Sequence, residues 1–265
     1  MAKGDLSAAI AKMDYASNLA PDDAGIALEL AQLQARREDW NGVLRATLRG
    51  LRAAPDAAPL WELRGRAGAA LARTGSEPWT APVEAFSRCV ALDRHFTECL
   101  EGLSEAALFA GNETLAADAA RAAIRSDPTR ARGYALLGDL YLRLGLVDEG
   151  EAVLREAKRV VTEPPRELVT VRVLLAESLM DRGQIADAAT ELEAAKAAAP
   201  PEDQALLLYS LGSVYARMTP PRKQEAIQTL TAFAKRACKG ARAARFATEC
   251  TVAQSLVMQL GAALQ

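Results

Sequence analysis

The feature that most constrains the fold is an interval close to 34 residues that recurs along the chain. Five prolines and one arginine, which stands where a proline is expected, mark it: Pro21, Pro55, Arg94, Pro128, Pro164 and Pro200. The successive spacings are 34, 39, 34, 36 and 36 residues. A near-constant period of this length predicts stacked supersecondary units rather than one large core.

The clearest copy of the unit begins at Ala131. Tyr134 and Tyr141 stand seven residues apart, which places them on one stripe of a first helix. Gly138 lies on the same stripe and leaves room for a second helix to approach closely. Gly145 is expected to end this first helix.

The second helix of this unit continues the apolar pattern. Leu154 and Ala157 extend the apolar face, and Pro164 and Pro165 are expected to stop the helix. The unit resembles the tetratricopeptide (TPR) repeat, W-x2-L-G-x2-Y, A-x3-F, P, with Tyr for Trp, Gly for Ala and Leu for Phe. The resemblance implies an all-α fold, a right-handed α-α superhelix whose first helices line the concave face.

We expect one continuous TPR solenoid domain over residues 1–265. Its parts are a half repeat at 4–23, six full repeats at 24–57, 58–96, 97–130, 131–168, 169–204 and 205–240, and a capping helix at 244–264. The repeat at 58–96 is longer, and the excess falls at Gly75 to Pro82, which predicts an extended inter-helix turn. The half repeat reads as a second helix alone, so we expect an upstream segment, with room there for a signal peptide or lipid anchor.

Composition and charge narrow the function classes. Half of the residues are apolar but only 5% are aromatic, which suits closely packed, Ala-rich helices. A net charge of -2 gives no electrostatic case for nucleic-acid binding. No apolar run is long enough to span a bilayer.

Catalytic groups are scarce. His95 is the only histidine, which removes most metal sites and nearly all Ser-His and Cys-His arrangements. It lies between two repeats, where a solvent-exposed turn residue is the simplest interpretation. The glycines are dispersed and form no phosphate-binding loop. We therefore expect no enzymatic activity and no cofactor.

The four cysteines form two pairs, Cys89 with Cys99 and Cys238 with Cys250. Each pair is placed about an inter-helix turn, so antiparallel helices would bring its members side by side and a disulfide is geometrically feasible. The alternative is that each cysteine is a small buried apolar residue. Disulfides would indicate an oxidising compartment.

In the TPR family, ligand-facing side chains occur at positions 2, 5, 9, 12 and 13 of a repeat. Carried over by the resemblance, these positions give Glu98, Glu101, Glu105, Leu108, Phe109, Arg132, Asp139, Leu142, Arg143, Thr170, Val173, Glu177, Met180, Leu206, Tyr209, Ser213 and Arg217. Five acids, Glu98, Glu101, Glu105, Asp139 and Glu177, are expected to lie close together and to attract a Lys- or Arg-bearing segment. The alternative is a solvated helix face. The carboxylate clamp that grips chaperone C-termini needs Lys, Arg and Asn here, so we predict against an EEVD-type ligand.

The leading hypothesis is a non-enzymatic adaptor that binds a peptide or protein in its concave groove. The Ala- and Arg-rich composition looks bacterial, and the cysteine pairs favour the periplasm or the inner face of the outer membrane. The resemblance suggests pilus or secretin assembly, polysaccharide export or motility. Two alternatives stay open: a TPR module of a larger enzyme, and a cytosolic regulatory adaptor with reduced thiols.

Overall fold

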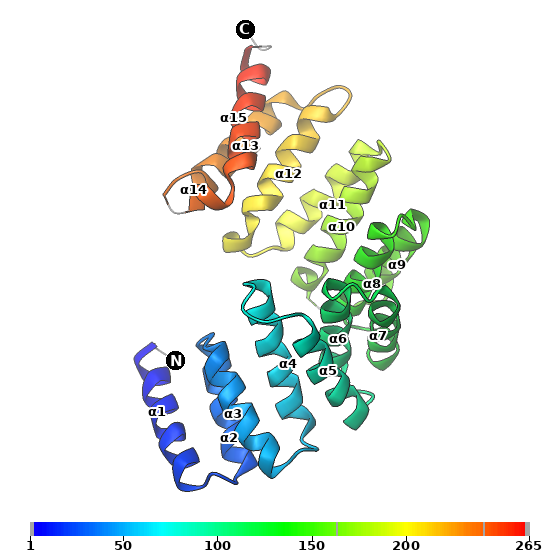
Figure 1. Ribbon diagram of the computed structural model, residues 1–265. Helices are drawn as coiled ribbons and strands as arrows, with labels where there is room; N and C mark the ends of the chain where they lie inside the picture. Colours follow the sequence, from blue (N-terminus) through cyan, green and yellow to red (C-terminus); the bar gives the residue numbers. More distant parts are fainter. Residues whose placement is uncertain (1–2, 163, 241, 263–265) are drawn as a thin grey trace. The chain divides into compact units, whose positions relative to one another are not determined.

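The chain is described by a computed structural model that covers residues 3–162, 164–240 and 242–262. All regular secondary structure in these ranges is helical, which confirms the all-α prediction. The chain divides into two compact units, residues 1–128 and 129–265 (Figure 1). A single continuous domain therefore stays a prediction.

The first unit contains the half repeat and three full repeats. Its helices are α1 (Lys3–Leu19), α2 (Ala24–Arg36), α3 (Trp40–Ala53), α4 (Ala58–Arg73), α5 (Thr80–Leu92), α6 (Thr97–Phe109) and α7 (Glu113–Ser126). The hairpins α2–α3, α4–α5 and α6–α7 are the three repeats, and α1 packs against α2. First helices of neighbouring repeats also contact one another, α2 with α4 and α4 with α6.

The second unit contains three repeats and the C-terminal helices. Its elements are α8 (Ala131–Arg143), α9 (Val147–Val160), the 3-10 turn η1 (Pro165–Leu168), α10 (Val169–Asp181), α11 (Ile185–Ala198), the 3-10 turn η2 (Pro201–Asp203), α12 (Gln204–Arg217), α13 (Lys223–Ala237), α14 (Arg242–Arg245) and α15 (Ala247–Ala262). The hairpins are α8–α9, α10–α11 and α12–α13. Helices α8 and α10, the first helices of two adjacent repeats, pack together.

Glycines on the first helices set how closely the hairpins pack. A Cβ atom added at Gly138 would lie 2.6 Å from Cδ2 of Leu154, and one added at Gly65 would lie 2.6 Å from Cε1 of Phe86. Real Cβ atoms essentially never come that close, so a larger residue at either site requires the facing side chain or its helix to shift. The close approach expected at Gly138 is confirmed.

Left-handed residues end the first helices. Gly145 has φ +75° just after α8, as predicted, and is the middle residue of the three-residue turn, 144–146, that leads into α9. The corresponding residue after α2 is Glu38, with φ +60°. A non-glycine side chain in this conformation is strained, because its Cβ crowds the backbone.

Helix α9 ends at Val160, before Pro164 and Pro165, as predicted, because a proline ring within the helix would clash with the carbonyl of the fourth residue before it. Two other predicted boundaries were wrong. The long turn covers residues 74–79 only. Pro82 is the third residue of α5, where the amide that proline lacks would have no helical partner anyway.

The second wrong boundary is that of the capping helix predicted at 244–264. The buried Phe246 separates a short α14 from α15, which begins at Ala247. Residues 263 and 264 lie outside the described residues. Helix α15 packs on α13 and α12, where its residues join the core formed by Leu208, Leu230 and Phe233.

Both cysteine pairs form disulfides in the structure. Cys89–Cys99 joins α5 to α6 with Cα atoms 6.1 Å apart, and Cys238–Cys250 joins the end of α13 to α15 with Cα atoms 5.7 Å apart. Each bridge therefore ties a second helix to a helix that comes after it in the sequence. None of the described helices combines the length and apolar character needed to cross a membrane.

Candidate functional site

The candidate site is a pocket of about 490 Å³ between the first helices α8 and α10, which we call the acidic pocket. Its lining residues are Asp139, Leu142, Arg143, Val147, Leu174, Glu177, Ser178, Asp181 and Arg182. The residues from α10 recur at i, i+3, i+4 and i+7, so they share one stripe of that helix. Three carboxylates and three aliphatic side chains therefore face the same space.

The charges in the acidic pocket are unevenly compensated. Nε of Arg143 donates to both carboxylate oxygens of Asp139 at 2.9 Å. Among the described residues, neither Glu177 nor Asp181 forms an ion pair. Burial raises the pKa of Glu177, and the charges of Asp139 and Asp181 raise it further against the opposing effect of Arg143. The pocket therefore has negative charge that the surrounding cations do not balance.

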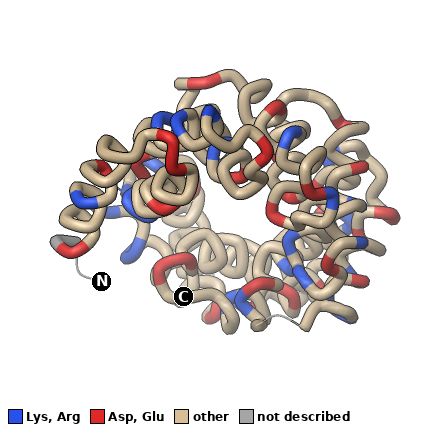
Figure 2. The backbone as a smooth tube through the Cα atoms, turned by 90° about the horizontal axis from the view of Figure 1, so that it is seen from below, with Lys and Arg blue, Asp and Glu red and all other residues tan. Residues whose placement is uncertain are grey.

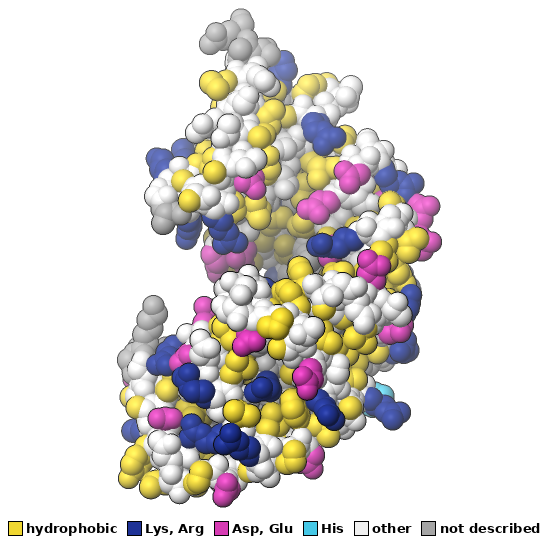
Figure 3. All heavy atoms as spheres, viewed as in Figure 1, with side chains coloured by type: hydrophobic (Ala, Val, Ile, Leu, Met, Phe, Trp, Pro, Cys, Tyr) yellow, Lys and Arg dark blue, Asp and Glu magenta, His cyan; other side chains and the backbone are white. Residues whose placement is uncertain are grey.

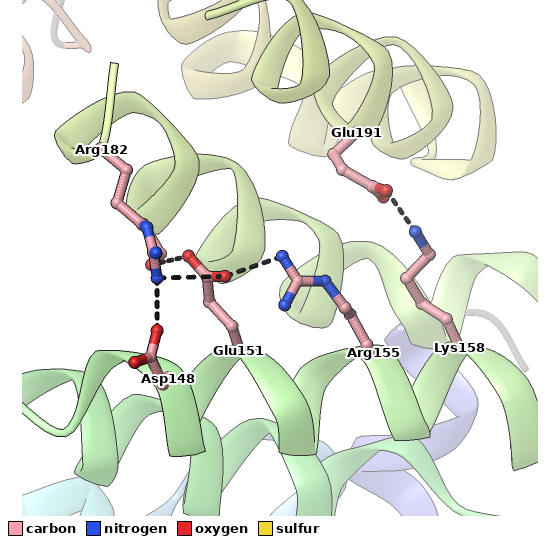
Figure 4. A network of polar contacts seen from close by, with 7 residues as sticks. Asp148, Glu151, Arg155, Lys158, Arg182 and Glu191 are labelled. Carbon is pink, nitrogen blue, oxygen red and sulfur yellow. Dashed lines mark hydrogen bonds and ion pairs between the residues drawn. The ribbon is translucent and has the colours of Figure 1, made fainter. Parts of the chain in front are cut away.

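A network of ion pairs anchors the wall of the pocket (Figure 4). Glu151 of α9 is only 2% exposed, and its carboxylate accepts hydrogen bonds from Ser178 at 2.8 Å and Arg155 at 2.7 Å. Arg182 donates to Asp148 at 2.6 Å and lies 3.8 Å from Glu151. The network fixes α10 against α9, so the positions of Ser178 and Arg182 in the pocket are set by contacts behind it.

A second part of the network holds the next hairpin. Lys158 and Arg172 both bind the carboxylate of Glu191, which is nearly buried in α11. The distance from Arg172 Nη1 to Glu191 Oε2 is 2.8 Å. Two cations on one carboxylate tie α11 to α9 and α10, which is the arrangement that a mostly buried charge requires.

In the first unit, the predicted acids on α6 have different surroundings. Glu98 is exposed, and Glu105 is half-buried and paired with Arg73 of α4. Burial raises the pKa of Glu62 on α4; Arg66 opposes this and Glu98 adds to it. Glu62 and Glu98 thus form a smaller acidic pair on the neighbouring first helices α4 and α6.

The prediction that Glu101 faces a ligand was wrong, because its side chain is only 2% exposed. Helix α6 contacts α4, α5 and α7, so few of its positions reach solvent. Phe109 is 49% exposed, but its ring stacks on Trp79 with centroids 4.6 Å apart. The long turn of one repeat therefore rests on the first helix of the next.

The other predicted site residues do not join the acidic pocket. Tyr209 packs against Phe233 in the C-terminal core, with ring centroids 5.4 Å apart. Arg217 lines a separate pocket of about 290 Å³ with Gly183 and Asp187. Arg132 is exposed and Met180 is half-buried. Of the predicted residues, Asp139, Leu142, Arg143 and Glu177 are the ones that meet in one pocket.

Sequence reasoning missed Asp181 and Glu62. Asp181 is the thirteenth residue counted from Val169, so the family positions cover it, and it lies four residues after Glu177 on the same helix stripe. Glu62 is the fifth residue of the repeat at 58–96, to which the positions were not applied. The family positions, applied to every repeat and to all five positions, would have identified both residues.

Charged residues of both signs are distributed over the two units (Figure 2), and the face seen in Figure 3 mixes them with hydrophobic side chains. Within the described ranges, no group of three or more His, Cys, Asp or Glu side chains could hold a metal ion.

The helical hairpins, their small-residue contacts and the packing of first helices define a helical-repeat protein. Comparison with solved structures identifies the fold as that of TPR proteins, as the sequence predicted. A tetratricopeptide repeat protein from Parabacteroides merdae is 16% identical, with a TM-score of 0.66 over 97% of this chain and 93% of its own.

Two further structures are similar. PilF of Pseudomonas aeruginosa is 15% identical, with a TM-score of 0.65 over 87% of this chain and 99% of its own. PilW, a type IV pilus biogenesis factor, is 16% identical, with a TM-score of 0.65 over 85% and 98%. No protein-family model matches the sequence, and neither does any curated protein.

Proposed function

We propose that this chain is a non-enzymatic scaffold that binds an extended segment of a partner protein and places a Lys or Arg of that segment in the acidic pocket. The observation that carries the proposal is that Glu177 and Asp181, neither of which has an ion-pair partner, line the same pocket as three aliphatic side chains. These side chains are Leu142, Val147 and Leu174. A guanidinium or ammonium group entering there would gain charge-assisted hydrogen bonds from carboxylates that are already in place.

The apolar walls explain why the occupant is a peptide and not a small cation. A Lys or Arg side chain has an aliphatic stem, which would pack against Leu142 and Leu174 while its charged end reaches the acids. Neighbouring apolar residues of the segment would add burial, and burial supplies most of the affinity in such contacts. The acids then set specificity against acidic segments.

The test uses a pair of fluorescein-labelled peptides that differ at one residue. One has Arg between two Leu residues, and the other has citrulline, which has nearly the same shape as Arg but no charge. Fluorescence anisotropy should show tighter binding of the Arg peptide. The double variant Glu177→Gln/Asp181→Asn should weaken that binding at least about tenfold, which corresponds to about 1.4 kcal/mol.

The matched control is Glu149→Gln, an exposed acid in the first turn of α9 that does not line the pocket. It should leave the affinity unchanged. Equal binding of the Arg and citrulline peptides, or equal loss in the control and the double variant, would contradict the proposal.

We further propose that the scaffold works in an oxidising compartment, the bacterial envelope, in an assembly such as that of a type IV pilus. The support is the pair of disulfides and the likeness in fold to PilF and PilW. Protein isolated with immediate alkylation of thiols should have the mass of the unmodified, doubly bridged chain. Four alkylated cysteines would instead favour the cytosolic adaptor.

A further inference from the structure

The segment that leads from α13 to α15 carries charge of one sign. Between Glu225 and Glu249 the sequence has five basic residues and no acidic one. We call these five residues the basic patch: Lys235, Arg236, Lys239, Arg242 and Arg245. The whole chain has a net charge of -2, so the basic patch differs in sign from the chain that carries it.

All five side chains of the basic patch are exposed, and among the described residues none of them forms an ion pair. Arg236 donates at 3.1 Å to Oε1 of Gln204, which is a neutral acceptor. The guanidinium of Arg245 lies 5.3 Å from the ring centroid of the buried Phe246. The basic patch therefore presents cations whose charge is not neutralised by an ion pair within the described chain.

The core holds the path of this segment in place. Cys238 is bridged to Cys250, and both Cys250 and Phe246 belong to the core formed by α12, α13 and α15. Arg242 and Arg245 are three residues apart in α14, so they project from the same side of it. Dark blue side chains gather around α14 in Figure 3. Because the backbone is already ordered, little conformational entropy is lost when the cations bind.

Three acidic residues border the basic patch without pairing with it. Glu202 and Asp203 directly precede Gln204, the partner of Arg236, so they lie on the side of α12. Glu249 lies in the first turn of α15. Among the described residues, none of the three forms an ion pair. Set against five basic residues, they leave an excess of positive charge.

The side chains around the cations favour a broad anionic surface over a nucleic acid. In residues 226–262 the aromatic residues are Phe233 and Phe246, and both are buried, so neither can stack on a base. Ala243 and Ala244 separate Arg242 from Arg245. Their short side chains leave the long cationic ones to project furthest, which suits simultaneous contact with a layer of phosphate groups.

We propose that the basic patch docks the chain reversibly on a lipid bilayer that contains anionic headgroups, such as phosphatidylglycerol. Clusters of about four to eight Lys and Arg residues at a membrane surface are typical of proteins that bind anionic lipids. The attraction acts within roughly a Debye length of the headgroups and needs no helix to enter the bilayer. This contact does not involve the acidic pocket, so it is independent of the scaffold function proposed above.

The test measures how the 265-residue chain sediments with sucrose-loaded vesicles. One set of vesicles is phosphatidylcholine alone, and the other contains roughly one third phosphatidylglycerol. The chain should sediment with the anionic vesicles only, and salt at about 0.5 M should release it, because salt screens exposed charges. Since the chain has a net charge of -2, overall attraction to anionic vesicles cannot produce this result.

A triple variant and a matched control locate the contact. Lys239→Gln/Arg242→Gln/Arg245→Gln should lower the partition coefficient about a hundredfold, since each lost cation costs about fivefold. The control Arg52→Gln/Arg88→Gln/Arg94→Gln removes the same charge from exposed arginines of the first unit that form no ion pair within the described residues. It should bind like the parent chain. Circular dichroism checks that both variants stay folded.

A labelled peptide of glutamates distinguishes a membrane from an acidic protein segment. A parent chain that ignores both sets of vesicles but binds this peptide would overturn the proposal and assign the basic patch to a protein partner. Equal loss of vesicle binding in the two triple variants would also overturn it, as would vesicle binding that salt does not weaken.

Discussion

The hydroxyl of Ser178 in α10 donates a 2.8 Å hydrogen bond to Oε1 of Glu151 in α9, a carboxylate that is only 2% exposed. This bond joins two adjacent repeats behind the acidic pocket. A buried carboxylate that loses a donor keeps its desolvation cost. The bond therefore stabilises both the junction between the repeats and the position of α10.

We predict that Ser178→Ala lowers the free energy of unfolding by about 1.5 kcal/mol, the scale of a hydrogen bond to a charged group. Urea titration followed by circular dichroism measures the change. Thr190→Ala is the matched control, because Thr190 is exposed on α11 and bonds only to the carbonyl of Ala186 in its own helix. Equal losses in the two variants would mean that the bond to Glu151 contributes nothing specific.

The raised pKa of Glu177 predicts that removing this carboxyl stabilises the protein, whereas Ser178→Ala destabilises it. The folded chain holds this proton more tightly than the unfolded chain, so ionisation costs stability; the cost begins as the pH rises past the unfolded pKa and is complete above the folded pKa. Glu177→Gln should stabilise the protein at pH 7 by a few tenths of a kcal/mol, roughly the size expected for a solvent-screened group. The gain should shrink as the pH falls through the folded pKa.

Urea titrations at neutral and acid pH test this prediction. Glu149→Gln serves as the comparison, since Glu149 is exposed and lies outside the pocket. A gain for Glu177→Gln that does not depend on pH would show that ionisation of this carboxyl is not the cause.

The helices could be predicted from the sequence because their signals are local. Gly145 indicates a left-handed helix end, and Gly138 indicates a close contact between helices. Both features depend only on the Cβ that glycine lacks. The exact ends were less predictable, because the buried Phe246 interrupts the last helix through its tertiary contacts.

The site was less predictable than the fold, since burial depends on all the neighbours of a helix. Repeat position correctly brought Asp139 and Glu177 to one pocket. Repeat position alone could not predict that Glu101, which is also at a ligand-facing position of the family, is buried by the helices that pack around α6. The network of Glu151 and Ser178 joins residues 27 apart in the sequence, and no local pattern indicates it.

The left-handed Glu38 leads to a further prediction. We expect Glu38→Gly to raise the free energy of unfolding by about 0.5 to 1 kcal/mol, because glycine removes the strain of φ +60° but makes the unfolded chain more flexible. The reverse change, Gly145→Ala at φ +75°, should destabilise by about 1 kcal/mol. Thermal unfolding of both variants measures the changes. Destabilisation by Glu38→Gly would show that contacts of the Glu38 side chain outweigh the backbone strain.

The two disulfides should differ in how readily they are reduced. Cys89 and Cys99 are fully buried, whereas Cys238 is half-buried at the end of α13 and can be reached by a thiol. We expect dithiothreitol to open Cys238–Cys250 first, as shown by timed alkylation and peptide mass mapping. Hydrogen exchange should then rise in α15 before it rises in α6, because the opened bridge is the one that ties α15 to α13.

In concentrated urea both bridges should open at similar rates, since burial no longer protects either. If Cys89–Cys99 opened as fast as Cys238–Cys250 in the folded protein, access to the sulfur atoms could not be what protects it.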